Sequence, residues 1–322
     1  MAETWVDQGG YLSNNELNKR WVKTAQPMMK FRQFTDVKSS LGKHKGQTEN
    51  WLKVSNLGTY GGKLTETNTM HESTQAKAWG TLTVDEYGNS IPLTQKVRDL
   101  SRFELDDIIR KGLTDDMVKC LDGEVERQFN ATLLRYVGTA TGGYVLTTNG
   151  TATATNSSVA NTYHIRKMVL ELKKRNVPGY GQLNGDYVFI GSHEAMENMF
   201  AALQDLNQYV ETGHKKILNG EVGRYFGVRF VEDGFASRFT YDSTARTATA
   251  KSWTNALSLD GYLFGAETVK EAVVIPEEIR AKEETDYGRS RGLAWYFLGG
   301  WQIMWDTSGA GDSRIIKWDS AA

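Results

Sequence analysis

The stretch SRFELDDIIRKGLTDDMVKCLDGEVERQFNATLLRYV, residues 101–137, decides the fold. Its apolar residues recur at spacings of three and four, which is typical of one face of an α-helix. They are Leu105, Ile108, Ile109, Leu113, Met117, Leu121, Val125 and Phe129. Ser101 is placed to cap the first turn, with Glu104 three residues later. Such a helix would run ~55 Å at ~1.5 Å per residue, so we expect a spine longer than a compact small domain needs.

Two strand-like runs precede this helix and predict a long protruding hairpin. The first, residues 47–57, alternates so that Leu52 and Val54 share one face and Trp51 and Lys53 the other. The second covers residues 79–84, and the segment between the two runs is polar and rich in glycine. An isolated two-stranded ribbon is marginally stable in water, so we expect another surface to hold this one.

Residues 1–45 are polar and mixed, which predicts an extended arm with a short helix near residues 14–24. Ordering such an arm costs about 1 to 2 kcal/mol per residue, which only neighbouring surface can offset. The arm therefore suggests a partner, and we expect another copy of the chain.

The second half of the sequence predicts an α/β part followed by strands. A helix with Ile165, Met168, Val169 and Leu172 on one face is followed by a buried strand at 187–190, a helix capped by Ser192 and a strand at 227–231. Beyond residue 266 the pattern is strand-rich, and antiparallel pairing is expected because the predicted turns at Gly299-Gly300 and 308–312 leave no room for helical crossovers. The predicted strands there are 272–275, 277–281, 293–298, 301–305 and 315–318.

Composition excludes several functional classes. The 322 residues include 38 basic and 39 acidic side chains, a formal charge of −1, so no global field attracts nucleic acid or membrane. No apolar run approaches the ~20 residues of a membrane span, and residues 1–5 carry no secretion signal, so a soluble, unexported protein is expected. Cys120 is the only cysteine, which excludes an internal disulfide and favours a buried, inert thiol.

The candidate catalytic and metal-binding patterns are weak. His193 and Glu197 lie at i and i+4 of a predicted helix and could share a metal, but no third ligand stands out. Gly220, Gly223 and Gly227 match neither a dinucleotide-binding nor a phosphate-binding loop, so turn geometry explains them better. We therefore assign no catalytic, cofactor-binding or metal-binding residue and expect a protein that is not an enzyme.

Charged clusters leave two interpretations open. The acidic runs at 277–278 and 283–286 could hold a cation or act as paired carboxylates, and a solvated or intersubunit face is favoured. The basic clusters at 173–175 and 215–216 could meet phosphate or the acids of a neighbour, and solvated surface is favoured.

Four short motifs carry a resemblance when they are taken in order. They are Gly42-Lys43-His44-Lys45-Gly46-Gln47 before Trp51, Tyr87-Gly88 before Leu93-Thr94, Asn219-Gly220-Glu221-Val222-Gly223, and Gly227-Val228-Arg229-Phe230-Val231-Glu232. In this order and spacing the chain resembles the major capsid proteins of tailed bacteriophages, in the group named after N-four-like phages. The resemblance covers roughly residues 40–235 and continues more loosely to the C-terminus.

The resemblance implies an α+β chain with the Hong Kong 97 capsid fold. Its implied parts are an N-terminal arm at 1–45, an E-loop hairpin at 46–87, a peripheral domain with the spine helix at 88–160, an axial domain at 161–265, and the C-terminal strands of the peripheral domain at 266–322. It also implies hexamers and pentamers that form an icosahedral shell around double-stranded DNA. The expected location is the virion capsid, after synthesis in the cytoplasm of the bacterial host.

By position, the resemblance implies intersubunit contacts at Trp51, Lys53, Leu57, Tyr60, Trp79, Tyr209, His214 and Arg289. The implied partners are other copies, a portal, packaged DNA by weak contact and, because only about 45 residues precede the E-loop, a separate scaffolding protein. Residues 234–258 resemble an insertion that would form an ordinary hairpin or bind a decoration protein. Two alternatives stay open: an encapsulin-like compartment shell, and a metal-dependent hydrolase using His193, Glu197 and the acids at 283–286.

Overall fold

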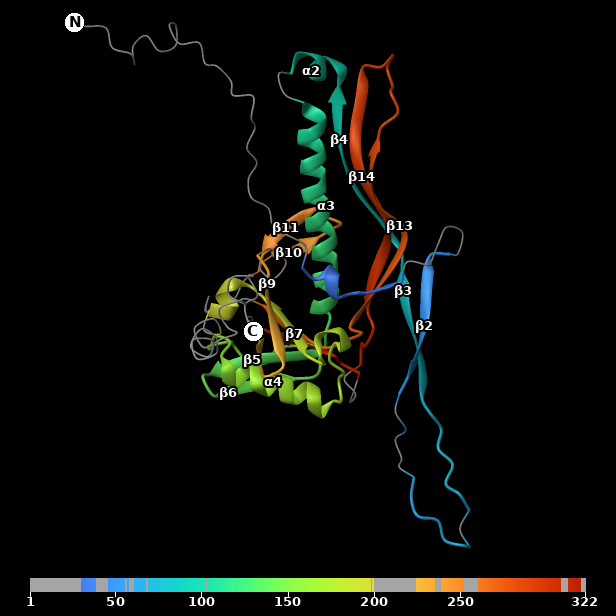
Figure 1. Ribbon diagram of the computed structural model, residues 1–322, viewed down its shortest axis with the longest axis vertical. Helices are drawn as coiled ribbons and strands as arrows, with labels where there is room; N and C mark the ends of the chain where they lie inside the picture. The colour runs from blue at the N-terminus through green and yellow to red at the C-terminus, as the bar shows by residue number, and fades with distance from the viewer. Residues whose placement is uncertain are drawn as a thin grey trace, which may run out of the picture.

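The computed structural model describes residues 30–38, 46–55, 57, 61–67, 69–101, 104–197, 199, 224–234, 239–251, 260–307 and 312–319. Figure 1 shows an elongated molecule. A long helix and several long strands extend upward from a part that contains a sheet and shorter helices, and a hairpin extends downward beside them. The named elements are η1 (Arg32–Phe34), β1 (Asp36–Lys38), β2 (Thr48–Val54), β3 (Lys77–Thr83), β4 (Asp85–Thr94), α2 (Gln95–Leu100), α3 (Leu105–Asn130), β5 (Leu134–Ala140), β6 (Gly143–Thr147), α4 (Thr162–Lys174), η2 (Gly181–Leu183), β7 (Tyr187–Gly191), β8 (Arg224–Tyr225), β9 (Val228–Glu232), β10 (Phe239–Asp242), β11 (Thr247–Ala250), β12 (Gly261–Phe264), β13 (Val269–Ala281), β14 (Ser290–Ile303) and β15 (Ile315–Trp318).

The predicted spine helix is present as α3, but it is shorter than the sequence pattern indicated. Its 26 residues give a length of about 39 Å at ~1.5 Å per residue. Ser101 does not cap α3; it closes α2, with its backbone N–H donating to the Val97 carbonyl. Residues 134–137 are strand because Leu134 and Tyr136 are buried in the sheet formed with β15. Pairing with a distant strand therefore overrides the local helical pattern.

A four-stranded sheet, in the order β1-β13-β14-β4, lies beside α3 along its length (Figure 1). β13 and β14 pair antiparallel, as predicted for the strands beyond residue 266. β4 also pairs antiparallel with β14, which the sequence did not predict. The predicted turn at Gly299-Gly300 is wrong, because both glycines lie inside β14. A Cβ on Gly300 would lie 2.3 Å from the Thr83 carbonyl oxygen. Glycine at this position therefore allows the base of the hairpin to approach β14 closely.

The second sheet has seven strands in the order β6-β5-β15-β12-β7-β9-β8. It combines strands from three of the expected ranges: β5 and β6 from 88–160, β7, β8, β9 and β12 from 161–265, and β15 from 266–322. The prediction that the last strands pair antiparallel holds only in part for β15, which is antiparallel to β12 but parallel to β5. The helix predicted from Ile165, Met168, Val169 and Leu172 is present as α4. At its start the Asn161 side chain accepts a hydrogen bond from the His164 backbone N–H.

The middle of α3 is buried on every side, from Leu121 to Glu126. The sequence pattern predicted one apolar stripe, yet this segment also buries three carboxylates, each at most 4% exposed. Glu126 lies 2.6 Å from the Lys251 ammonium and accepts a hydrogen bond from the Tyr262 hydroxyl. Burial lowers the pKa of Lys251, but the attraction of Glu126 and Asp260 outweighs it and raises that pKa overall.

Gly123 and Cys120 show how closely the β10–β11 hairpin packs on α3. A Cβ on Gly123 would lie 2.7 Å from the Tyr241 Cβ atom. The Cys120 thiol is buried, as the sequence predicted. Burial raises the pKa of Cys120 to about 11, so the thiol is protonated at neutral pH.

Asp122 attaches the N-terminal segment to α3. Its carboxylate accepts the backbone N–H groups of Lys30, Phe31 and Arg32 at 2.9 to 3.2 Å. Phe31 is fully buried and packs edge-on against Phe129. Burial raises the pKa of Asp122 to about 7, against the opposing effect of the backbone donors.

This raised pKa predicts a specific pH dependence of stability. The folded chain binds the Asp122 proton more tightly than the unfolded chain, whose carboxyl titrates near about 3.9. The stabilising contribution is therefore complete below about pH 4 and is lost as the pH rises through about 7. The side chain in Asp122→Asn does not titrate, so the free energy of unfolding of the variant does not fall in this way. The difference between variant and wild type should therefore shift in favour of the variant as the pH rises from about 4 to about 7. Denaturant unfolding at a series of pH values measures it, and parallel curves for the two proteins would contradict it.

Candidate subunit interface

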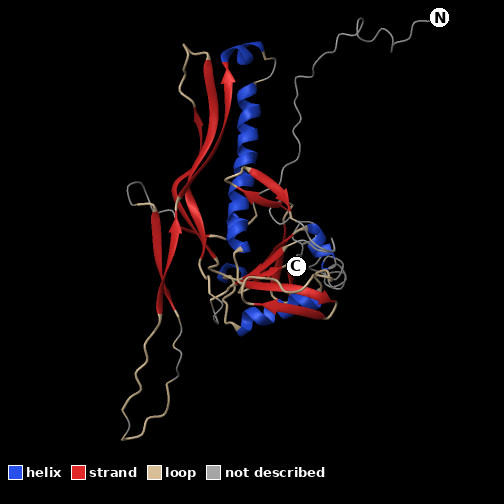
Figure 2. Ribbon diagram, turned by 180° about the vertical axis from the view of Figure 1, so that it is seen from behind, coloured by secondary structure: helices blue, strands red, loops and turns tan. Residues whose placement is uncertain are grey.

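The β2–β3 hairpin extends away from the rest of the chain in both ribbon views (Figures 1 and 2). Its strands are antiparallel, as predicted, and Leu52 is paired with Trp79 while Trp51 is paired with Gly80. Side chains alternate between the faces of a strand, so the ribbon has two distinct faces. We call the face with Trp51 and Leu82 the inward face, and the face with Leu52, Val54 and Trp79 the outward face.

The inward face holds the hairpin against its own chain. Leu82 is fully buried with Val84 and Ala272. The Trp51 ring occupies the space over Gly80, where a Cβ would lie 2.2 Å from the ring. The Lys270 ammonium lies 5.2 Å from the centroid of that ring. These contacts join the base of the hairpin to β13 and β14.

Ion pairs reinforce the same attachment. Lys53 lies 2.6 Å from the Asp306 carboxylate, and its side chain is only 11% exposed. Lys270 also lies 3.4 Å from Glu49, whose side chain is 4% exposed. Both side chains of the Lys270–Glu49 pair are largely covered, so this pair is screened less than a surface pair. Asp306 is 58% exposed, so its pair with Lys53 is screened more.

The outward face is apolar and uncovered. Trp79 is 71% exposed, and its cross-strand partner Leu52 is 49% exposed. Val54 on the same face, and Leu57 just beyond it, are 41% and 50% exposed. Burying such side chains fully stabilises a protein by about 1.5 to 3 kcal/mol each. Contiguous exposed apolar residues of this kind mark interaction surfaces.

The eight expected intersubunit residues fall into three groups. Leu57 and Trp79 are exposed, and so is Arg289, 3.6 Å from Asp286 near the turn between β13 and β14. Trp51 and Lys53 contact their own chain through the inward face. The other three lie outside the described residues: Tyr60, Tyr209 and His214.

The sequence did not single out Leu52 and Val54 as contact residues. Strand alternation separated them correctly from Trp51 and Lys53, and that was the available signal. Alternation cannot tell which face lies against the body, because that depends on β13 and β14, about 200 residues further along the chain.

Residues of the weaker candidate sites form ion pairs with other residues of this chain. His193 Nδ1 lies 3.0 Å from Glu232 rather than sharing a site with Glu197. The described residues contain no group of three side chains able to hold a metal ion, and no described helix is long and apolar enough to span a membrane. Several of the acids at 277–286 pair with arginines of this chain: Glu277 with Arg32, Glu278 with Arg280, Glu284 with Arg291, and Asp286 with Arg289.

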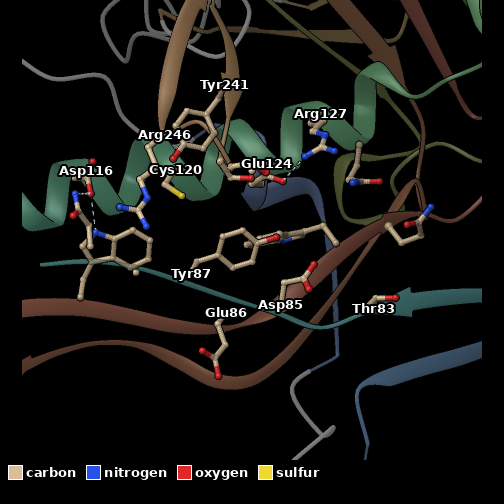
Figure 3. Close-up of a pocket in the computed structure, with 18 residues that line it drawn as sticks. Thr83, Asp85, Glu86, Tyr87, Asp116, Cys120, Glu124, Arg127, Tyr241 and Arg246 are labelled. Atoms are coloured by element: carbon tan, nitrogen blue, oxygen red, sulfur yellow. Dashed lines mark hydrogen bonds and ion pairs between the residues drawn. The ribbon is translucent and has the colours of Figure 1, made fainter.

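A pocket of about 690 Å³ lies between α3, β4, β14 and the β10–β11 hairpin (Figure 3). Four acids and two arginines contribute to its lining: Asp85, Glu86, Asp116, Glu124, Arg127 and Arg246. The Cys120 thiol and the Tyr87 hydroxyl in its lining are held protonated at neutral pH, because burial raises the pKa of both. The pocket therefore presents charged and hydrogen-bonding groups.

Comparison with known proteins identifies the fold of this chain. No family model matches the chain, and no curated protein sequence matches it. Solved structures do match over nearly the whole length. The head structure of Helicobacter pylori bacteriophage KHP40 is 14% identical, with a TM-score of 0.69, over 97% of this chain and 96% of that one. The capsid of Ralstonia phage GP4 is 14% identical, with a TM-score of 0.66, over 100% and 98%.

A third structure, the capsid asymmetric unit of cyanophage Pam1, is 12% identical, with a TM-score of 0.64, over 97% of each chain. At these identities the likeness shows the fold. The chain has the α+β Hong Kong 97 fold of phage capsids, as the sequence motifs predicted.

The two faces of the hairpin predict different effects of truncation on the isolated chain. Leu82→Ala removes a fully buried side chain and should lower the free energy of unfolding by about 2 to 5 kcal/mol. Trp79→Ala removes a larger but exposed side chain and should change it by no more than about 0.5 kcal/mol. Denaturant unfolding of unassembled protein measures both. A large loss of stability in Trp79→Ala would mean that the outward face packs on its own chain.

Proposed function

We propose that this chain is the major capsid subunit of a tailed bacteriophage, assembling as hexamers and pentamers into an icosahedral shell around double-stranded DNA. The observation that supports it most is the uncovered outward face of a hairpin whose inward face is fixed to its own body. A monomer gains nothing from exposing Trp79 and Leu52, whereas a neighbouring subunit can cover them. The fold shared with phage capsids supports the same conclusion.

In this proposal the hairpin is the E-loop and lies across the adjacent subunit through Leu52, Val54, Leu57 and Trp79. Residues 1–45 act as the arm, which is anchored to its own chain through Phe31 and β1. Residues 88–160 with 266–322 act as the peripheral domain, and 161–265 as the axial domain around the capsomer centre. Arg289 would meet an adjacent capsomer, and Tyr60, Tyr209 and His214 would meet neighbours within one. The protein is structural and not an enzyme.

The proposed partners beyond other copies are a portal, a separate scaffolding protein and weakly contacted packaged DNA. A decoration protein is a further candidate for the region 234–258, whose described part is the hairpin of β10 and β11 with β11 wholly exposed. The chain would be made in the host cytoplasm and used in the virion capsid.

Assembly tests the proposal directly. The chain is expressed with and without the neighbouring scaffolding gene, and the products are imaged by negative-stain electron microscopy. Wild type should give closed shells or capsomer rings. Leu52→Asp with Trp79→Asp should abolish them while the thermal unfolding of the subunit stays close to wild type, because both side chains are exposed in the isolated chain.

The matched control is Leu52→Met with Trp79→Phe, which keeps the outward face apolar and should assemble. A wild-type protein that stays monomeric in both preparations would overturn the proposal. Shells that carry a co-purified enzyme and no DNA would point to an encapsulin-like compartment instead.

A further inference from the structure

The outward face of α4 is strongly basic. Its inward residues are fully buried against the seven-stranded sheet and include Ile165, Met168 and Leu172. The residues facing away from that core include four cations: Arg166, Lys167, Lys173 and Lys174. We call these four side chains, together with Phe226 of the β8–β9 turn, the basic face.

The Phe226 ring lies close to the charged groups of two of these cations. The Arg166 guanidinium lies 5.9 Å from the centroid of its ring, and the Lys173 ammonium lies 5.2 Å from it. Phe226 is 43% exposed and has a φ of 50°, a backbone conformation uncommon for a bulky residue. The ring attracts positive charge without neutralising it, so the cations remain available to an anion.

Carboxylates neutralise little of this charge. Glu171, the only acid on α4, lies 3.0 Å from Arg175 and 3.9 Å from Lys174. Within the described residues, no carboxylate pairs with Arg166, Lys167 or Lys173. Several other cations do have carboxylate partners, as in the pairs of Glu284 with Arg291 and Glu277 with Arg32. Among the described residues, three cations without a carboxylate partner therefore lie together on one helix of a chain whose formal charge is −1.

We propose that the basic face binds the phosphate backbone of double-stranded DNA and thus forms part of the inner surface of the shell. This inference rests on the proposed function, which places DNA against one side of the subunit. From Arg166 to Lys174 the helix axis advances about 12 Å, a length of duplex that carries roughly seven phosphates. Lysine and arginine heads on such a face contact phosphates without reading base sequence.

Salt-dependent DNA binding by the unassembled full-length chain tests the assignment. The probe is a fluorescent duplex of about 30 base pairs, titrated at about 50 to 200 mM NaCl. The triple variant Arg166→Gln, Lys167→Gln and Lys173→Gln should bind roughly tenfold more weakly or worse. The slope of log affinity against log salt should become shallower by about 2.7, at about 0.9 for each phosphate that the variant no longer neutralises.

The matched control removes three exposed cations elsewhere: Lys63→Gln, Lys96→Gln and Lys282→Gln. It should bind like wild type. An unchanged affinity and slope in the triple variant, or an equal weakening in the control, would overturn the assignment to α4. Binding of polyglutamate with no binding of duplex would also overturn it, in favour of an acidic protein partner.

The two proposals fail separately in this design. Loss of shells in the wild type would refute the proposed function whatever the DNA result. Wild-type shells together with DNA binding that does not depend on the basic face would refute only this inference.

Discussion

The buried segment of α3 from Leu121 to Glu126 is the constraint on which the rest of the structure depends. Burying an unpaired charge is far more costly than any single packing gain, and each of the segment's three carboxylates has a partner on at least one oxygen. Asp122 is met by the N-terminal segment and Glu126 by Lys251 and Tyr262. Glu124 lies 3.5 Å from Arg127 on the same helix. Buried polar groups of this kind fix which segments meet, more than they add to net stability.

This arrangement gives the chain a stiff centre and an exposed periphery. Helix α3 packs against β14 and β4 through Trp295, whose indole N–H donates to Asp116, and against the other sheet through Phe129 and Phe264. Among the described residues, the hairpin contacts the rest of its chain through its inward face, while the outward face stays exposed and can contact another molecule. The separation of a rigid body from an uncovered apolar ribbon is what a subunit of a closed shell requires.

The sequence predicted the elements whose signal is local. The periodicity of α4 and the buried run at β7 are both confirmed, as are the β2–β3 pairing and the burial of Cys120. Features set by distant contacts were missed or misassigned. The local pattern predicts helix for Leu134 and Tyr136, because it carries no information about their partners in β15, about 180 residues away. It predicts a turn at Gly299-Gly300, because the close approach of Thr83 to Gly300 is a contact between distant segments. The buried acids of α3 were missed for the same reason.

The central claim is that the hairpin is an interface element of a shell and not a free extension. Hydrogen–deuterium exchange of its backbone amides, compared between unassembled subunits and purified shells, tests this most directly. The account predicts that amides of β2, β3 and the loop 61–76 exchange quickly in the subunit and become strongly protected in the shell, while those of β7 are protected in both. Equally fast exchange of the hairpin in both states would contradict it.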